Sequence, residues 1–148
     1  MGMPADERLG VDLHRADQEL LAAKRVAVEP AGLTVPQYAA LHVLAANAGI
    51  SGAALARSCQ VTPQAMAVLL RGLTDRGLVE RAPHPWHRNV LETRLTDAGR
   101  AALELADARA VAVERALRAE FTAAEREQLR ALLGRATDAL RRAADALD

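Results

Sequence analysis

The stretch that most constrains the fold of this chain is residues 51–77, SGAALARSCQVTPQAMAVLLRGLTDRG. It predicts two short helices joined by a tight connection. Ser51 suits the N-cap of the first helix because its hydroxyl can accept a backbone N–H bond. The second helix begins at Thr62-Pro63, where threonine supplies the cap and proline occupies the first helical position, at which a missing N–H costs nothing. Gly77 is typical of a helix end.

The second of these helices has two contrasting faces. One face repeats apolar residues at i, i+3, i+4 and i+7, the spacing of a buried helix stripe: Met66, Leu69, Leu70 and Leu73. The opposite face carries small and polar residues: Thr62, Gln64, Ala65, Val68, Arg71 and Asp75. A short helix, a turn and a second helix with such an outer face indicate a helix-turn-helix that reads DNA.

Directly after these helices the hydrophobic period changes. Two runs, 79–83 (VERAP) and 90–96 (VLETRLT), flank the loop 84–89 (HPWHRN). The second run alternates between two faces, as a half-buried strand does, with Leu91, Thr93 and Leu95 opposite Val90, Glu92 and Arg94. We therefore predict a two-stranded β-hairpin, a wing, after the second helix.

A helix-turn-helix followed by a wing resembles the MarR family of winged helix-turn-helix transcriptional regulators. The matching segments are LTDRGLVER (73–81), the wing loop with Arg88 near its tip, and RLTDAGRAAL (94–103). The resemblance covers most of the chain. It implies a mainly α fold in a single winged-helix domain, 1–148, with a DNA-binding part at 34–96.

Long helices are predicted at both ends of the chain. One is expected from residue 6 to about 28, and another from Thr34 to about 47, burying Leu41, Leu44 and Ala45. Thr96 is expected to cap a third helix and Thr122 a fourth, and both Thr34 and Thr122 begin capping boxes.

Apolar seams on such helices usually pair with another chain. In MarR-like proteins the first and last two helices intertwine into a dimer, which here are 6–29 and 97–148. The predicted dimer contacts are Leu9, Leu13, Leu20, Val113, Leu117, Leu129, Leu133, Leu140 and Leu147. The alternative is a bundle formed within one chain.

Composition sets bounds on the class of protein. At 148 residues and zero net charge, the chain suits one domain. Residues 57–94 nevertheless hold six arginines and three carboxylates, a local balance of +3, which favours a DNA-facing surface. The single cysteine excludes an internal disulfide and a multi-cysteine zinc site. No membrane span or signal peptide is predicted, so we expect a cytoplasmic protein without a membrane partner.

The first turn of the second helix is expected to meet base edges. Gln64 can pair with adenine, and Ala65 and Val68 can contact thymine methyl groups. Arginines on these helices suit phosphates. Many family members carry a polar or basic pair where this chain has Ala67-Val68, so shape readout is expected to carry more of the specificity. The predicted DNA-contacting residues here are Ser51, Arg57, Thr62, Gln64, Ala65, Val68, Arg71 and Arg76; the alternative is a solvated helix surface.

The wing loop is the second predicted DNA contact. Family members typically carry a carboxylate, any residue and then an arginine at the wing tip, and this chain has His87-Arg88-Asn89 there. Arg88 is expected to reach a groove or a phosphate. His84 and His87 are candidates for pH sensitivity, or for sharing an ion without completing a metal shell. Trp86 is expected to be exposed at the tip.

A small-molecule effector is the remaining partner that the resemblance implies, because MarR-like proteins often bind small aromatic acids between their dimerisation and DNA-binding parts. The candidate pocket residues are His14, Tyr38 and His42; the alternative is ordinary core or surface histidines. Cys59 is interpreted as inert packing, with peroxide sensing as the alternative.

Three function classes follow from these residues. The favoured one is a homodimeric regulator, most simply a repressor, of a palindromic double-stranded operator. The second is a helical interaction module that keeps the fold without binding DNA. An enzyme is disfavoured because no nucleophile–base pair, phosphate loop or metal shell can be assembled, and no cofactor or metal is predicted.

Overall fold

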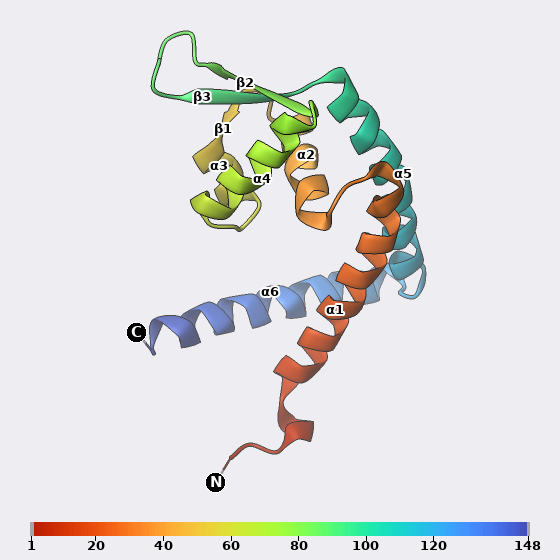
Figure 1. Ribbon diagram of the computed structural model, residues 1–148. Coiled ribbons are helices and arrows are strands. Elements are labelled where there is room, and N and C mark those ends of the chain that lie inside the picture. The colour runs from red at the N-terminus through yellow and green to blue at the C-terminus, as the bar shows by residue number, and fades with distance from the viewer. Residues whose placement is uncertain (1, 148) are drawn as a thin grey trace. The chain divides into compact units, whose positions relative to one another are not determined.

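The computed structural model describes residues 2–147, and Figure 1 shows a mainly helical chain with a small sheet. The chain divides into two compact units, one ending at Val111 and the other beginning at Ala112. The elements in order are η1 (Ala5–Glu7), α1 (Leu9–Val28), η2 (Glu29–Ala31), α2 (Val35–Ala46), β1 (Ile50–Ser51), α3 (Gly52–Ser58), α4 (Pro63–Asp75), β2 (Val79–Pro83), β3 (Leu91–Leu95), α5 (Asp97–Ala119) and α6 (Ala123–Asp145).

The predicted helix caps are confirmed. Ser51 Oγ accepts the N–H of Ala54 at 3.2 Å, and Thr62 Oγ1 accepts the N–H of Ala65 at 3.1 Å. Capping boxes form at both predicted positions, where the hydroxyl takes the third helical N–H and the glutamine or glutamate returns the bond: Thr34 with Gln37, and Thr122 with Glu125. These contacts are local in sequence, which is why the sequence predicts them.

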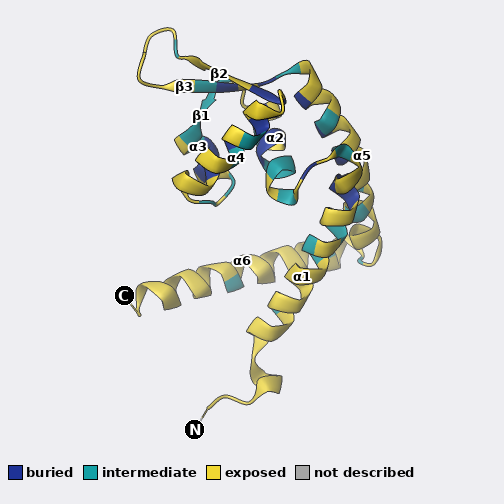
Figure 2. Cartoon of the chain, in the orientation of Figure 1, coloured by how far each residue is buried: buried dark blue, intermediate teal, exposed yellow. Residues whose placement is uncertain are grey.

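The core of the first unit lies between α2, α3, α4 and the sheet, where Figure 2 shows the buried residues gathered. Its largest fully buried side chains are Leu41, Leu44, Leu55, Met66, Leu70, Leu73 and Val28, together with the polar Thr93. The predicted stripe of α4 is confirmed, with Leu69 half-buried beside it. The prediction for α2 was wrong at Ala45, which is exposed, whereas Ala40 is buried.

The wing is an antiparallel hairpin of β2 and β3, as predicted, in which Val79 pairs with Leu95 and Pro83 with Leu91. The sheet has a third strand, because β1 pairs with β3 through Ile50 opposite Thr93. A two-residue strand has no period of its own, so the sequence predicted only two strands. The third strand attaches the base of the wing to the start of α3.

The first helix begins later than residue 6. Arg8 is extended (φ −90°, ψ 90°) and separates η1 from α1, and its Nε donates to the carbonyl of Met3 at 2.9 Å. At the other end of α1, Arg109 on α5 donates from Nε to the carbonyl of Ala27 at 3.0 Å. This bond satisfies one of the helix C-terminal carbonyls, which lack partners within the helix.

A close contact joins the end of α4 to the start of α5. Thr96 donates its hydroxyl to the carbonyl of Gly77 at 2.6 Å and accepts the N–H of Gly99 at 3.0 Å. Its own N–H donates to the carbonyl of Leu78 at 3.1 Å. A Cβ added at Gly99 would lie 1.9 Å from that Leu78 carbonyl oxygen, so the two backbones approach as closely as glycine permits.

The second unit contains the end of α5 and all of α6. No residue of α6 is buried, and in Figure 2 the helix carries only the exposed and intermediate colours. The turn between the helices is held by Arg126, whose Nη1 donates to the carbonyls of Phe121 at 2.8 Å and Arg118 at 3.2 Å. None of the helices within residues 2–147 combines the length and the apolar character needed to cross a membrane.

Candidate nucleic-acid interface

The helix-turn-helix is closed by a turn in which three consecutive residues donate backbone hydrogen bonds to α3. Cys59 donates its N–H to Leu55 at 2.9 Å, and Gln60 and Val61 donate to Arg57 and Ala56 at 3.2 and 3.0 Å. Gln60 adopts the left-handed conformation, with φ 56°, which reverses the chain within the turn. The turn therefore fixes α4 relative to α3 without a glycine.

The outer face of α4 is open to solvent over its first two turns. Gln64, Ala65 and Arg71 are exposed, and 65% of Val68 is accessible. Thr62 is exposed too, but its oxygen already accepts the N–H of Ala65. The Thr62 hydroxyl therefore keeps its O–H donor and one further lone pair for a DNA contact.

The predicted phosphate-binding arginines do not all lie together. Arg57 on α3 and Arg71 on α4 are exposed. Arg76 follows the last residue of α4, about 20 Å along the helix axis from Thr62 at 1.5 Å per residue. Its Nη1 lies 3.5 Å from Gln37 Oε1 at the start of α2. The hydroxyl of Ser51 serves as the α3 cap.

The wing loop exposes His87, Arg88 and Asn89, and Trp86 is the most open of its side chains, at 85%. Two backbone bonds close the loop: the N–H of His84 donates to Val90 at 2.7 Å, and that of Val90 donates to His87 at 2.9 Å.

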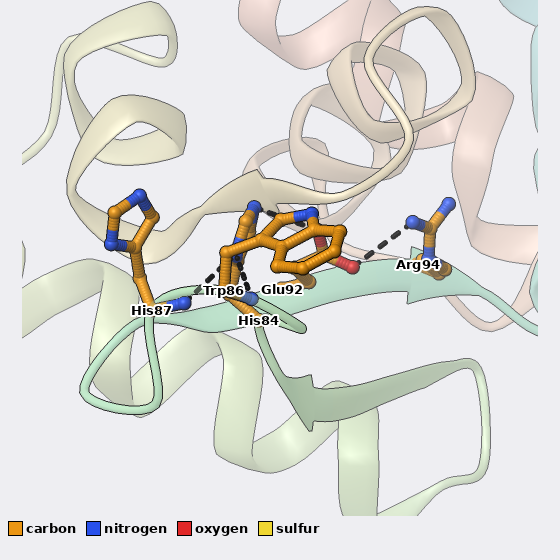
Figure 3. Close-up of polar contacts among 5 residues, drawn as sticks. All are labelled: His84, Trp86, His87, Glu92 and Arg94. Carbon is orange, nitrogen blue, oxygen red and sulfur yellow. Dashed lines mark hydrogen bonds and ion pairs between the residues drawn. The ribbon is translucent and has the colours of Figure 1, made fainter.

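A polar cluster at the base of the loop surrounds the imidazole of His84 (Figure 3). Its Nδ1 accepts the backbone N–H groups of Trp86 and His87, and its Nε2 lies 3.6 Å from Glu92 Oε1. Arg94 Nη2 donates to the other Glu92 oxygen at 3.0 Å. Strand alternation placed Glu92 on the solvent side, yet its side chain is only 17% exposed.

Metal binding at the two histidines gains no support from these neighbours. Across residues 2–147, no three histidine, cysteine, aspartate or glutamate side chains come together in a way that could hold an ion. The ring centroids of His84 and His87 are 5.1 Å apart.

Two of the three candidate effector residues lie together on α2. Tyr38 and His42 have ring centroids 5.9 Å apart. Tyr38 donates its hydroxyl to Asp107 Oδ1 on α5 at 2.7 Å, and His42 Nε2 lies 3.9 Å from the same oxygen. Nothing in the sequence marked Asp107, because its partners are 69 and 65 positions away. His14 is exposed on α1, on a different helix from Tyr38 and His42.

Cys59 is half-buried in the turn between α3 and α4. Burial raises the pKa of the Cys59 thiol, which disfavours the reactive thiolate. This environment agrees with the interpretation of Cys59 as inert packing.

The predicted dimer contacts are accessible on α1, α5 and α6. Leu13, Leu20 and Val113 are half-buried, and the others are exposed: Leu9, Leu117, Leu129, Leu133, Leu140 and Leu147. A groove between the end of α5 and α6 is lined by Leu117, Phe121, Leu129 and Leu133, with charged side chains at its edges.

Comparisons with known proteins agree with this architecture. A family model described as MarR family matches residues 31–88. The HTH-type transcriptional repressor Rv2887 of Mycobacterium tuberculosis is 36% identical over 133 residues, covering 90% of this chain and 96% of the relative.

Two solved structures extend the comparison to three dimensions. The crystal structure of the Mycobacterium tuberculosis MarR family protein Rv2887 in complex with salicylic acid superposes with a TM-score of 0.68 at 34% identity, covering 90% of this chain and 98% of that one. A mutant MarR from E. coli complexed with operator DNA superposes with a TM-score of 0.80 at 26% identity, covering 86% and 92%. The sequence matches and the structural superpositions thus identify the same family, and the chain belongs to the MarR family of winged helix-turn-helix transcriptional regulators.

Proposed function

We propose that this chain is a homodimeric repressor that reads a palindromic double-stranded operator with α4 and the wing. The observation that carries the proposal is the open face of α4, where Gln64, Ala65 and Val68 are exposed in a helix whose other face is anchored in the core by Met66, Leu70 and Leu73. A helix anchored in this way can enter the major groove without disturbing its core. The E. coli relative complexed with operator DNA has the same fold.

Each part of the interface has a distinct role. Gln64 reads a base edge, Ala65 and Val68 contact thymine methyl groups, and Thr62 donates its hydroxyl. Arg57 and Arg71 bind phosphates on either side of the helix-turn-helix. In the wing, Arg88 enters the minor groove or binds a phosphate, with His87 and Asn89 beside it. We assign Ser51 and Arg76 to supporting roles, as a cap and as a link to α2.

Dimerisation follows from the exposed helices. Most of the stability of a protein helix comes from packing its apolar face against other elements, and α6 buries none of its residues within the chain. We propose that residues 6–29 and 97–148 supply the dimer contacts and 34–96 the DNA-binding part. A second copy would cover the leucines along α6 and the groove beside Phe121.

A small aromatic acid is the effector class that fits the proposal. The relative from Mycobacterium tuberculosis was solved with salicylic acid. In this chain, a carboxylate would compete with Asp107 for the Tyr38 hydroxyl and the His42 imidazole. Because this contact joins α2 to α5, displacing it would alter how the DNA-binding part is held. Tyr38→Phe should weaken any release of DNA by salicylate while leaving DNA binding in its absence.

The deciding experiment selects bound sequences from random duplexes and then measures affinity across a salt series. The proposal expects a palindrome with half-sites about one helical turn apart and a steep decrease of affinity with salt. An interaction module of the same fold would bind no duplex at any salt concentration. Sedimentation of the DNA-free protein tests the dimer, and a monomer at micromolar concentration would refute it.

As a member of a family of transcriptional regulators, the chain is expected to act by binding rather than by catalysis. We expect it in the cytoplasm, where operator DNA is located.

A further inference from the structure

Several contacts of the wing loop converge on one side chain, the imidazole of His84. His84 directly follows β2, and dashed lines in Figure 3 connect its side chain to Trp86, His87 and Glu92. Nδ1 accepts the N–H of Trp86 at 3.1 Å and that of His87 at 3.2 Å. A side chain that accepts the N–H groups two and three residues later caps a turn in the way asparagine and aspartate do.

The composition of the loop explains the need for such a cap. Pro85 has no N–H to donate, and Pro83 ends β2. The two backbone bonds that close the loop involve only His84, His87 and Val90. The N–H of Trp86 points inward to the imidazole, so this one side chain fixes the backbone of the tip.

The other edge of the ring is also held. Nε2 lies 3.6 Å from Glu92 Oε1, and Arg94 donates to Glu92 Oε2 at 3.0 Å. A Cβ added at Gly49, in the turn before β1, would lie 3.1 Å from Arg94 Nη2 and 3.4 Å from the Glu92 carboxyl. The cluster therefore connects the loop to the base of the sheet.

We propose that His84 is a positioning residue for DNA binding, because its imidazole caps the wing loop and sets the direction of Trp86 and Arg88. The proposal rests on the proposed function and adds a residue that does not itself need to touch DNA. Where other wings carry a carboxylate beside the arginine, this one is organised from the base of its loop.

The geometry requires one protonation state. An imidazole nitrogen that accepts two N–H bonds has no proton, so the neutral ring carries its proton on Nε2, facing Glu92. Adding a proton to Nδ1 removes the acceptor and releases the loop. The charged and titratable groups around the ring are Glu92, whose Oε1 is 3.6 Å from Nε2, Arg94, which is bound to Glu92, and the imidazole of His87, whose centroid is 5.1 Å away. Since imidazoles titrate between about pH 5 and 8, acidification over that range should loosen the tip.

The capping arrangement can be tested without DNA by NMR of the full-length protein. At pH 8 the ¹⁵N shifts of His84 should show the Nε2–H tautomer, and the amides of Trp86 and His87 should exchange slowly. Both signs of the cap should disappear at pH 5.5. A ring with its proton on Nδ1, or unprotected Trp86 and His87 amides at pH 8, would overturn the proposal.

Three variants distinguish the role of the Nδ1 acceptor from that of the Nε2 donor. His84→Asn places an amide oxygen near the Nδ1 position and does not titrate, so it should keep amide protection and DNA affinity at both pH values. His84→Gln keeps a donor near Glu92 but loses the acceptor. His84→Gln and His84→Ala should lose the protection and bind the selected operator roughly tenfold more weakly. Equal weakening of all three variants would refute the role of the acceptor.

His87 is a second imidazole in the loop, so its contribution is tested by measuring the pH dependence of operator affinity in a protein that carries His87→Asn. The His87→Asn protein should still bind the operator more weakly on acidification, whereas the double variant that also carries His84→Asn should not. If the His87→Asn substitution alone removes the pH dependence, the dependence belongs to His87 and the inference is overturned. If the wild-type protein binds no duplex, the proposed function fails. The tautomer and exchange measurements still decide whether His84 caps the loop.

Discussion

Replacing Gly99 by alanine should destabilise this protein strongly, although glycine in a helix is normally the worse residue. Gly99 is the third residue of α5 and is buried. An added Cβ would lie 1.9 Å from the carbonyl oxygen of Leu78, against an ordinary contact of 3.4 Å or more. The obstacle is backbone, so no side-chain rotation relieves it and the start of α5 must move by about 1.5 Å.

The size of the effect follows from the bonds at this contact. Moving α5 strains the bond from Thr96 N–H to Leu78 and the hydroxyl bond from Thr96 to Gly77. Each is worth about 1 kcal/mol, and overpacking typically adds about 1–3 kcal/mol. The gain in helix propensity from glycine to alanine is at most about 1 kcal/mol. The net loss is therefore about 2–4 kcal/mol, or roughly 10 °C in Tm for a chain of this size.

Thermal unfolding followed by circular dichroism measures this loss, with Gly72→Ala as the matched control. Gly72 lies within α4, where an added Cβ meets nothing within 4 Å, so its replacement should raise the stability by up to about 1 kcal/mol. If Gly99→Ala melts at the wild-type temperature or above it, the close approach of α5 to Leu78 is not a feature of the folded protein.

Three further predictions concern DNA binding, thiol chemistry and acid stability. Arg71→Ala should reduce the slope of log affinity against log salt by about 1 for each protomer, and an unchanged slope would remove Arg71 from the phosphate contacts. Because burial raises the pKa of the Cys59 thiol, iodoacetamide at pH 8 should alkylate Cys59 more slowly than it alkylates a free cysteine; faster modification would contradict this. Bonds from the backbone and hydroxyl of Thr122 hold the pKa of Glu125 below its ordinary 4.5, so its stabilisation is complete above that value and lost as the pH falls through the lowered one. Glu125→Gln keeps the capping box but has no carboxyl group to protonate. Its urea unfolding midpoint should therefore decrease less between pH 6 and pH 3 than that of the wild-type protein.

The sequence predicts best what depends on neighbours along the chain. The caps at Ser51, Thr62 and Thr122 need only a hydroxyl and an N–H three residues later, and all three form. The buried stripe of α4 and the hairpin of the wing are likewise periodic, so pattern alone identifies them. The boundary at Arg8 was missed because the apolar spacing begins only at Leu9, so it does not fix where upstream of Leu9 the helix starts.

What the sequence could not supply are contacts between distant segments. The pairing of β1 with β3 depends on a two-residue strand that is recognisable only beside its partner. Asp107 meets Tyr38 across 69 positions, and no pattern in α5 distinguishes it from the other carboxylates there. The role of Gly99 is similar, since a helical glycine shows its purpose only when the opposing backbone at Leu78 is placed.

The wing shows how these two kinds of information combine. The sequence identified the loop and its exposed tip, and it raised both histidines as sensitive to pH. Placing Glu92 and Arg94 beside the ring distinguishes His84 from His87, because only His84 accepts backbone N–H groups on one edge while facing a carboxylate on the other. His84, which is absent from the predicted DNA contacts, is thus the residue that we propose positions the contacts of the wing. In a winged helix without an acidic residue at the tip, the residues that organise the wing are therefore to be sought at the base of the loop.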